Sequence, residues 1–322
     1  MNRRLKKIIK RFIPENIRRY LRKVYNNFLL IIINASQSMP FNLKRFLYYL
    51  YYSNEEYLLF LHIIKYCEED GSEELLNYSK YLKKNGLSVW LSDFISNYSS
   101  DDIPVYCTDS GWHYVLHNGK KLFGKRKWKE KELRDYYNSL LIEQDSCSPH
   151  RYLNEERMPQ NGDNAIVADI GAAEGIFSLD IIDKVKKVYL FECDEEWIEP
   201  LYKTFEPYKE KIEIVKRYVG SETTDNTISL DDFFQNTKVD YIKADIEGAE
   251  RELLKGARKT LQTKIKQILI CAYHLQDDEE IIVKNLSLSG FQVTINPGKM
   301  LIYYDEGIRP PYFRPGVIYG FK

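Results

Sequence analysis

The chain has 322 residues, 44% of them hydrophobic, and its 47 Lys and Arg residues balance its 47 Asp and Glu residues. This length and composition exclude a disordered chain, and they predict one main domain with a full hydrophobic core and an appended module. The five cysteines show no Cys-x-x-Cys spacing. This spacing argues against a zinc site and a disulfide framework and favours a reducing compartment.

The N-terminus is strongly basic, because residues 1–45 hold twelve Lys and Arg residues but one acid, Glu15. Apolar residues recur at helical spacing around Pro14, which predicts a basic amphipathic helical segment over residues 1–35. Such a segment binds an anionic membrane surface or packs on its own domain with its basic face in water, and both interpretations stay open. The apolar run at 28–33 is too short for a membrane span. We expect a cytoplasmic protein, either free or peripheral at the inner face of the membrane.

Two modules are predicted before the main domain. Residues 36–100 indicate a helical module, with Ser53 and Glu56 as a capping box and Gly86 as a helix stop. In residues 101–152, the turn Asn118-Gly119 between two apolar runs predicts a β-hairpin, and a helix follows over 129–143. A dense polar run at 143–152 then leads into the core domain, where the wall of a substrate site often forms.

The last region, residues 153–322, is predicted as a doubly wound α/β domain. Strands are expected at 165–170, 187–192, 212–216, 239–244 and 266–272, and helices at 175–185, 195–206, 248–261 and 277–288. This alternation is typical of a mostly parallel sheet with helices on both faces. Segments 291–295 and 301–304, joined by a turn at 296–299, predict an antiparallel last strand. That reversal favours a methyltransferase over a dehydrogenase.

A glycine turn follows the first of these strands. Asp169 ends the strand, and Gly171 and Gly175 allow a ligand to approach the backbone closely. Glu192 ends the next strand, where a carboxylate accepts hydrogen bonds from ribose hydroxyls. The turn lacks the Gly-x-Gly-x-x-Gly pattern of dinucleotide sites, and Glu174 would repel a pyrophosphate. The cationic sulfonium of S-adenosylmethionine is therefore favoured.

Polar groups also follow the fourth and fifth strands. Asp245 and Glu247 follow the fourth strand and His274 follows the fifth, so all three converge at the edge where such sheets bind ligands. We interpret His274 as the general base, with Glu247 as the second candidate. The structural alternatives remain open: His274 is then a hydrogen-bonded residue at a strand end, and Glu247 caps the following helix. Their spacing matches no established metal-ligand pattern, so no metal is predicted.

Together these motifs resemble the FkbM-type family of S-adenosylmethionine-dependent methyltransferases. The resemblance covers roughly residues 140–322 and rests on Asp169-x-Gly171-x-x-x-Gly175, Phe191-Glu192, Ser229-Leu230-Asp231-Asp232 and Ile242-Lys243-x-Asp245-x-Glu247-Gly248-Ala249-Glu250. Ala244 and Cys193 depart from the family pattern conservatively. The resemblance implies a Rossmann-like methyltransferase sheet and O-methylation of hydroxyls on sugars, polyketides or other bacterial products.

Two sets of site residues accompany this interpretation. The expected cofactor-binding residues are Asp169, Gly171, Ala172, Ala173, Glu174, Gly175, Glu192, Cys193 and Asp245. The run at 143–152 and Tyr273 look like a bacterial branch of the family, and the expected substrate residues are Asp145, His150, Arg151 and Tyr273.

The expected function is O-methylation of a glycan, a glycolipid precursor or a related bacterial product. The partners are then a small-molecule or glycan acceptor and an anionic membrane surface, without nucleic acid. One alternative is an NAD-dependent sugar oxidoreductase or epimerase, but the chain lacks the glycine triplet and a Tyr-x-x-x-Lys pair in the expected place. The other is a non-catalytic scaffold with the same fold.

Overall fold

The computed structural model describes residues 40–52 and 54–322. The chain divides into two compact units, Met1–Ser92 and Asp93–Lys322. The basic segment predicted over residues 1–35 and the capping position Ser53 lie outside the described residues. In the described part of the chain, no helix has the length and apolar character needed to cross a membrane.

The first unit contains three described helices, α3 (Phe41–Tyr51), α4 (Asn54–Asp70) and α5 (Glu73–Asn85). Tyr48, Phe60 and Leu82 are buried between them. Lys44 donates from Nζ to the carbonyl oxygen of Lys84 over 2.9 Å, which ties α3 to the end of α5. The predicted stop at Gly86 is confirmed, since Gly86 is the C-cap of α5 with φ +83°.

The second unit opens with the predicted hairpin. Strands β2 (His113–His117) and β3 (Lys120–Phe123) pair antiparallel around Asn118 and Gly119, both at positive φ. A two-residue strand, β1 (Tyr106–Cys107), which is too short to leave a sequence pattern, adds to β2. The helix predicted next is α6 (Glu130–Glu143). Four short 3₁₀ helices come before the first strand of the central sheet: η1 (Asp93–Asn97), η2 (Ser100–Asp102), η3 (Glu155–Arg157) and η4 (Gly162–Asn164).

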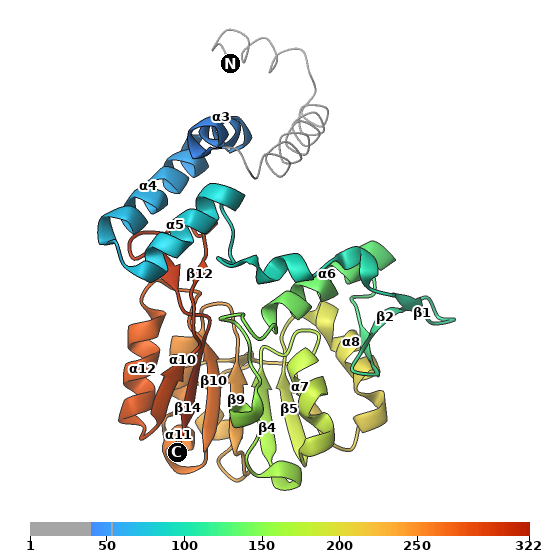
Figure 1. Cartoon of the computed structure of the whole chain (residues 1–322). Coiled ribbons are helices and arrows are strands. Elements are labelled where there is room, and N and C mark those ends of the chain that lie inside the picture. Colours follow the sequence, from blue (N-terminus) through green and yellow to red (C-terminus); the bar gives the residue numbers. More distant parts are fainter. Residues whose placement is uncertain (1–39, 53) are drawn as a thin grey trace. The chain divides into compact units, whose positions relative to one another are not determined.

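A seven-stranded sheet in the order β11-β14-β10-β9-β4-β5-β6 forms the centre of this unit (Figure 1). Its strands are β4 (Ile166–Ile170), β5 (Lys187–Phe191), β6 (Ile212–Val215), β9 (Tyr241–Ala244), β10 (Gln267–Cys271), β11 (Gln292–Ile295) and β14 (Val317–Phe321). All pairs are parallel except the two that β14 makes with β10 and β11. The predicted fold class, a Rossmann-like and mostly parallel sheet with helices, is confirmed.

The predicted pairing of 291–295 with 301–304 is wrong. Strand β11 pairs with β14, while the short strand β12 (Met300–Leu301) pairs with β13 (Phe313–Arg314). Four of the five residues of β14 are buried, whereas β11 is a largely exposed edge strand. Burying the more apolar strand at the interior position stabilises the sheet more than the local turn at Pro297-Gly298 could.

Helices cover both faces of the sheet. They are α7 (Ile176–Ile181), α8 (Glu195–Thr204), α9 (Leu230–Phe233), α10 (Glu250–Gly256), α11 (Arg258–Thr263) and α12 (Asp278–Leu288), with 3₁₀ turns η5 (Ile182–Lys184) and η6 (Glu206–Tyr208). Alternate strand residues belong to two separate cores, as the two-residue period of a strand requires. Val167 and Tyr241 pack with α6, α7 and α8, whereas Ala168 and Ile242 pack with α9 to α12. A small pair, β7 (Tyr218–Val219) and β8 (Thr227–Ile228), lies apart from the sheet.

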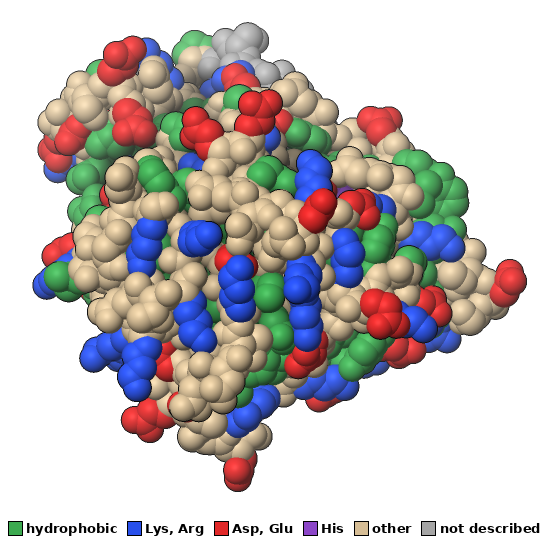
Figure 2. Space-filling model, turned by 90° about the horizontal axis from the view of Figure 1, so that it is seen from below, with side chains coloured by type: hydrophobic (Ala, Val, Ile, Leu, Met, Phe, Trp, Pro, Cys, Tyr) green, Lys and Arg blue, Asp and Glu red, His purple; other side chains and the backbone are tan. Residues whose placement is uncertain are grey.

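The amino and carboxyl ends of the parallel strands differ in charge. Lys186, Lys211 and Lys266 directly precede β5, β6 and β10 at their amino ends, and Lys and Arg side chains gather across the face seen from below (Figure 2). Glu192 and Asp245 follow β5 and β9 at the carboxyl ends. The carboxyl edge is therefore the acidic one, and in open α/β sheets it is the edge where ligands bind.

Candidate active site

The turn between β4 and α7 depends on two glycines. Gly171 has φ +73°, and a Cβ atom there would lie 1.8 Å from the carbonyl oxygen of Asp245. Gly175 has φ +89°, and a Cβ atom there would lie 2.7 Å from the ring of Phe205. Only glycine lets this turn reach the end of β9 and lets α7 start against α8.

Glu192 holds the turn from the neighbouring strand. Its Oε2 accepts a hydrogen bond from the Ala173 amide, and its Oε1 accepts from the amides of Cys193 and Asp194, each over 2.7 Å. A carboxylate offers about four acceptor positions, so these three amides leave room for one further donor. The carboxylate is thus fixed in orientation and still able to bind a ligand hydroxyl.

A cavity of about 350 Å³ lies beside Glu192. Its lining combines apolar and aromatic residues with acids and Arg217, and the ring centroids of Trp197 and Trp128 lie 5.3 Å apart in an edge-on arrangement. This is the size and character of a small-molecule site. The lining residues are Ile170, Gly171, Ala173, Phe191, Glu192, Cys193, Asp194, Trp197, Arg217, Tyr218, Val219, Asp245, Ile246, Glu247 and Ala249.

A second cavity, of about 260 Å³, shares Gly171, Ala173, Asp245 and Glu247 with the first. It is more polar than the first and is walled largely by residues of α6 and the polar run that follows. Its other lining residues are Tyr136, Leu140, Glu143, Gln144, His150, Tyr152, Ala172, Glu174, Ile176, Phe177, Lys243 and Tyr273. Two compartments therefore adjoin at the end of β9.

Asp169 and Lys243 form a buried ion pair beneath the turn. Lys243 Nζ lies 3.1 Å from Asp169 Oδ1 and donates to the carbonyl oxygen of Gly171 over 2.7 Å. Burial alone would lower the pKa of Lys243, but the charges of Asp169 and Asp245 outweigh it and raise that pKa. Asp169 also accepts from Ser178 Oγ over 2.6 Å and lines neither cavity. Its position is that of a residue that orders the turn.

Asp245 is the centre of the polar contacts between the cavities. Tyr152 donates to its Oδ2 over 2.7 Å and Tyr273 to its Oδ1 over 3.3 Å. Burial by itself would raise the pKa of Asp245, but the hydrogen bond and charge of His150, with the charges of Lys243 and His274, hold that pKa well below its usual range. Asp245 is consequently ionised at neutral pH.

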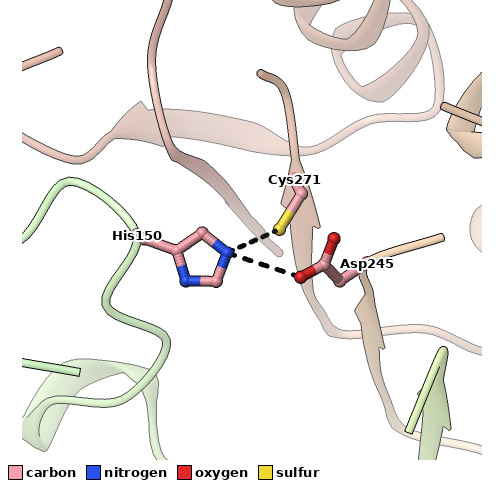
Figure 3. Close-up of side chains that lie close together, drawn as sticks. All are labelled: His150, Asp245 and Cys271. Atoms are coloured by element: carbon pink, nitrogen blue, oxygen red, sulfur yellow. Dashed lines mark hydrogen bonds and ion pairs between the residues drawn. The ribbon is translucent and has the colours of Figure 1, made fainter. Parts of the chain in front are cut away.

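His150 lies between Asp245 and Cys271, with Nε2 directed toward both (Figure 3). Nε2 is 3.4 Å from Asp245 Oδ2 and 3.8 Å from Cys271 Sγ. Burial raises the pKa of the Cys271 thiol well above its usual value, so the sulfur keeps its proton and is a poor metal ligand. These three side chains come close enough together to suggest a metal site, and the expectation of no metal stays a prediction.

The two residues expected to be catalytic have different settings. Glu247, at φ +54°, is exposed and lines both cavities. His274 lines neither, and its Nδ1 lies 3.0 Å from Glu250 while its Nε2 lies 3.5 Å from Asp245. Burial would lower the pKa of His274, but Glu250, Asp245 and Glu247 together raise it.

The remaining expected residues divide between cavity walls and supports. Ala172, Ala173, Glu174 and Cys193 line a cavity, whereas Gly175 does not. Of the expected substrate residues, His150 and Tyr273 line the smaller cavity, while Asp145 and Arg151 line neither. The Asp145 carboxylate instead accepts from the Tyr98 hydroxyl and from the Cys147 amide.

Sequence reasoning did not single out several residues of the smaller cavity. Tyr136, Glu143 and Gln144 come from α6 and its C-cap, and Tyr152 from the loop after it. Tyr136 donates to Glu174 Oε2 over 2.6 Å, which binds α6 to the glycine turn. The sequence signals for Glu143, Gln144 and Tyr152 were the polarity of the run at 143–152 and its resemblance to a bacterial branch of the family, and none marked Tyr136.

Glu143 makes the stability of the protein depend on pH. Burial and the charges of Glu174 and Asp245 raise the pKa of Glu143 to about 7, against the opposing charges of His150 and Lys243. A carboxyl with a raised folded-state pKa stabilises fully below its unfolded value, and this contribution is lost as the pH rises toward 7. We expect Glu143→Gln to raise the free energy of unfolding by about 2 kcal/mol at pH 8 and to leave it unchanged at pH 4. Urea denaturation measures both, and equal effects at the two pH values would contradict the prediction. The exposed Glu155→Gln is the matched control.

Known methyltransferases are similar to this chain. Residues 206–293 match the family model of the methyltransferase FkbM domain. No curated protein matches the chain. Among solved structures, the chain is similar to an FkbM methyltransferase from Methylobacillus flagellatus KT, with 20% identity over 60% of this chain and 56% of that one and a TM-score of 0.41. The chain thus spans little more than half the length of that protein.

A second similar structure is a precorrin-6y C5,15-methyltransferase from Geobacter metallireducens, with 14% identity over 51% of this chain and 85% of that one and a TM-score of 0.35. The family match lies inside the domain predicted over residues 153–322 and includes the motif from Ile242 to Glu250 that suggested the family. The recognition from sequence motifs is confirmed, because residues 206–293 of this chain match the methyltransferase FkbM domain.

Proposed function

We propose that this protein is an O-methyltransferase that methylates a hydroxyl of a glycan, a glycolipid precursor or a related bacterial product. The observation that carries the proposal is the pair of cavities that adjoin at Gly171 and Asp245. A methyl transfer needs a donor and an acceptor side by side in a fixed geometry, because much of its rate comes from positioning. Two neighbouring compartments at one sheet edge meet that need.

The larger cavity has the chemistry of a donor site. Glu192 keeps one acceptor position for a ribose hydroxyl, and Phe191, Trp197 and Val219 provide an apolar wall for an adenine ring. The acids Asp245 and Glu247 favour a cationic group where the two cavities adjoin. S-adenosylmethionine, which the family implies, supplies an electrophilic methyl group when bound.

The smaller cavity has the chemistry of an acceptor site. Tyr136, Tyr152 and Tyr273 supply aromatic surface and hydroxyls, and Glu143, Glu174 and Lys243 add charged groups to the lining. Its volume of about 260 Å³ suits one sugar-sized ring. A polyhydroxylated acceptor is therefore favoured over an apolar one. That His274 is the general base, with Glu247 as the alternative, stays a prediction.

Calorimetric titration of the full chain with S-adenosylmethionine, S-adenosylhomocysteine and NAD tests the donor half of this proposal. We expect binding of the first two and none of NAD. Binding of NAD alone would instead favour the sugar oxidoreductase, and binding of none of the three would favour the scaffold. Once the donor binds, transfer of a labelled methyl group to a panel of glycans identifies the acceptor, and transfer only to an amine or thiol would contradict O-methylation.

The membrane partner proposed for residues 1–35 has its own test. Each Lys or Arg near an anionic surface contributes about 1 kcal/mol to binding. We expect the full chain to sediment with vesicles of phosphatidylglycerol and phosphatidylcholine, and a chain lacking residues 1–35 to stay in the supernatant. This deletion leaves α3 intact. Phosphatidylcholine vesicles are the control, and sedimentation of the truncated chain with the anionic vesicles would refute the proposal.

A further inference from the structure

We infer that Gln144 and His150 together bind the acceptor hydroxyl, and that His150 Nδ1 receives its proton while Asp245 positions the imidazole. The inference rests on the proposed function and assigns the base of that reaction to a residue other than His274. It depends on two buried polar atoms, one a donor and the other an acceptor, that belong to residues lining the same cavity.

The first of these atoms is a hydrogen-bond donor. Gln144 Oε1 accepts a hydrogen bond from the Tyr152 amide over 3.0 Å. Because only the oxygen can accept this bond, it determines the positions of Oε1 and Nε2 in the side-chain amide. Gln144 Nε2 is buried and has no hydrogen-bond partner among the residues that the structure describes. It therefore offers a donor to whatever occupies the cavity.

The second atom is an acceptor. His150 is 3% exposed, and its Nε2 faces the ionised Asp245 carboxylate (Figure 3). A nitrogen that faces a carboxylate carries the proton, so in the neutral ring Nδ1 holds the lone pair. Nδ1 lies on the ring edge away from Asp245 and Cys271, and within the described part of the chain it has no hydrogen-bond partner.

A hydroxyl in this cavity can satisfy both atoms, because its oxygen can accept from Gln144 Nε2 while its hydrogen is donated to His150 Nδ1. Leaving a buried donor or acceptor unpaired costs about 1 to 3 kcal/mol per group, so binding a hydroxyl here recovers that cost twice. A carboxylate ligand would lack the hydrogen for His150, and an ammonium ligand would lack the acceptor for Gln144.

His274 is less suited to this task for a geometric reason. Both of its ring nitrogens lie 3.0 to 3.6 Å from carboxylate oxygens of Glu250, Asp245 and Glu247, and it lines neither cavity. These carboxylates raise the pKa of His274 against the effect of burial, which favours the imidazolium, a form that has no lone pair to accept a proton. Its charge serves to hold those carboxylates together.

The transfer step balances with His150 as the base. The acceptor oxygen forms a bond to the methyl carbon, the carbon–sulfur bond breaks and its electron pair stays on sulfur. The hydroxyl proton moves to His150 Nδ1, and the imidazolium formed is stabilised by Asp245, whose Oδ2 lies 3.4 Å from Nε2. A positioned base of this kind contributes about 10²- to 10⁴-fold to a rate.

Nuclear magnetic resonance of the full chain, labelled with ¹⁵N-histidine and saturated with S-adenosylhomocysteine, tests the inference without a known acceptor. His150→Gln assigns the resonances, and the exposed His62→Gln is the matched control. At a pH where the His150 ring is neutral, we expect the tautomer with hydrogen on Nε2. The opposite tautomer would overturn the inference.

Methanol, the smallest alcohol, is the probe for the hydroxyl site. We expect it to shift the His150 Nδ1 resonance with saturation, and Gln144→Leu to raise the midpoint concentration at least about five-fold while affinity for S-adenosylhomocysteine is retained. No shift with methanol, or an unchanged midpoint in Gln144→Leu, would refute the paired site. If the unmodified protein does not bind S-adenosylhomocysteine, the proposed function itself is refuted. Failure of the paired hydroxyl site and failure of the proposed function are therefore distinguishable.

Discussion

Replacing Glu192 with alanine is expected to weaken the binding of S-adenosylhomocysteine by about 100-fold, or about 2.7 kcal/mol. A hydrogen bond to a charged group contributes about 1.5 to 3 kcal/mol, and the ligand would lose the one acceptor position that the carboxylate still offers. The amides of Ala173, Cys193 and Asp194 would lose their partner as well, which loosens the turn under the ligand. Calorimetric titration measures the affinity directly.

Glu192→Gln is the matched control for that experiment. The amide keeps the shape and one carbonyl oxygen of the side chain, so we expect a loss of about 10-fold, between the unmodified protein and the alanine variant. Circular dichroism shows whether both variants keep the fold. Unchanged affinity in Glu192→Ala would mean that the ligand lies elsewhere and would remove the main support for the donor cavity.

Replacing Gly171 with alanine is expected to lower the free energy of unfolding by at least about 3 kcal/mol, which lowers the melting temperature by roughly 6 to 12 °C. The new Cβ atom would lie 1.8 Å from the carbonyl oxygen of Asp245. The backbone fixes the position of the Cβ atom and the oxygen belongs to the backbone, so no side-chain rotation relieves the clash. The turn or the end of β9 must move. Because Gly171 and Asp245 line both cavities, we also expect the binding of S-adenosylhomocysteine to be lost.

Gly162→Ala separates this clash from the cost of a positive φ. Gly162 has φ +49°, but a Cβ atom there meets no heavy atom within 4 Å. Its substitution should cost only about 1 to 2 kcal/mol of backbone strain and leave ligand binding intact. Thermal unfolding and calorimetric titration compare the two variants, and equal effects would show that conformation, not contact with β9, fixes the glycine at position 171.

The difference between the supports and the walls of the site affects how further variants should be interpreted. Asp169 and Lys243 form an ion pair beneath the turn. Asp169 lines neither cavity, whereas Lys243 lines the smaller one. Removing either partner leaves the other charge buried, which costs about 3 to 5 kcal/mol. Loss of activity in such a variant therefore indicates loss of structure before it indicates a role in methyl transfer.

Most elements of the core domain could be predicted because their signals are local. The strands around Val167 and Ile242 are apolar apart from Asp169 and Lys243, which is typical of strands buried on both faces. Asp169, Glu192 and Asp245 could be placed at one edge because parallel strands end there. The hairpin at Asn118-Gly119 was equally local, since the turn residues determine its geometry.

The acceptor side could not be predicted in the same way. Tyr136, Glu143 and Gln144 belong to a helix that precedes the sheet, and nothing in their own sequence indicates which strand end they approach. Their place follows from the packing of Leu133 and Tyr137 of α6 into the core on one face of the sheet. Packing of this kind depends on shape across the whole face, not on a motif.

The sequence by itself determined the fold class, the glycine turn, the acidic strand ends and the family, because each depends on spacing along a short segment. The tertiary structure decided which distant segments meet. Strand β14 lies between β10 and β11 because burying its apolar residues is worth more than a local hairpin. His150 reaches Asp245 only because the loop after α6 packs over the ends of β9 and β10, and that contact depends on the hydrophobic burial of the entire domain.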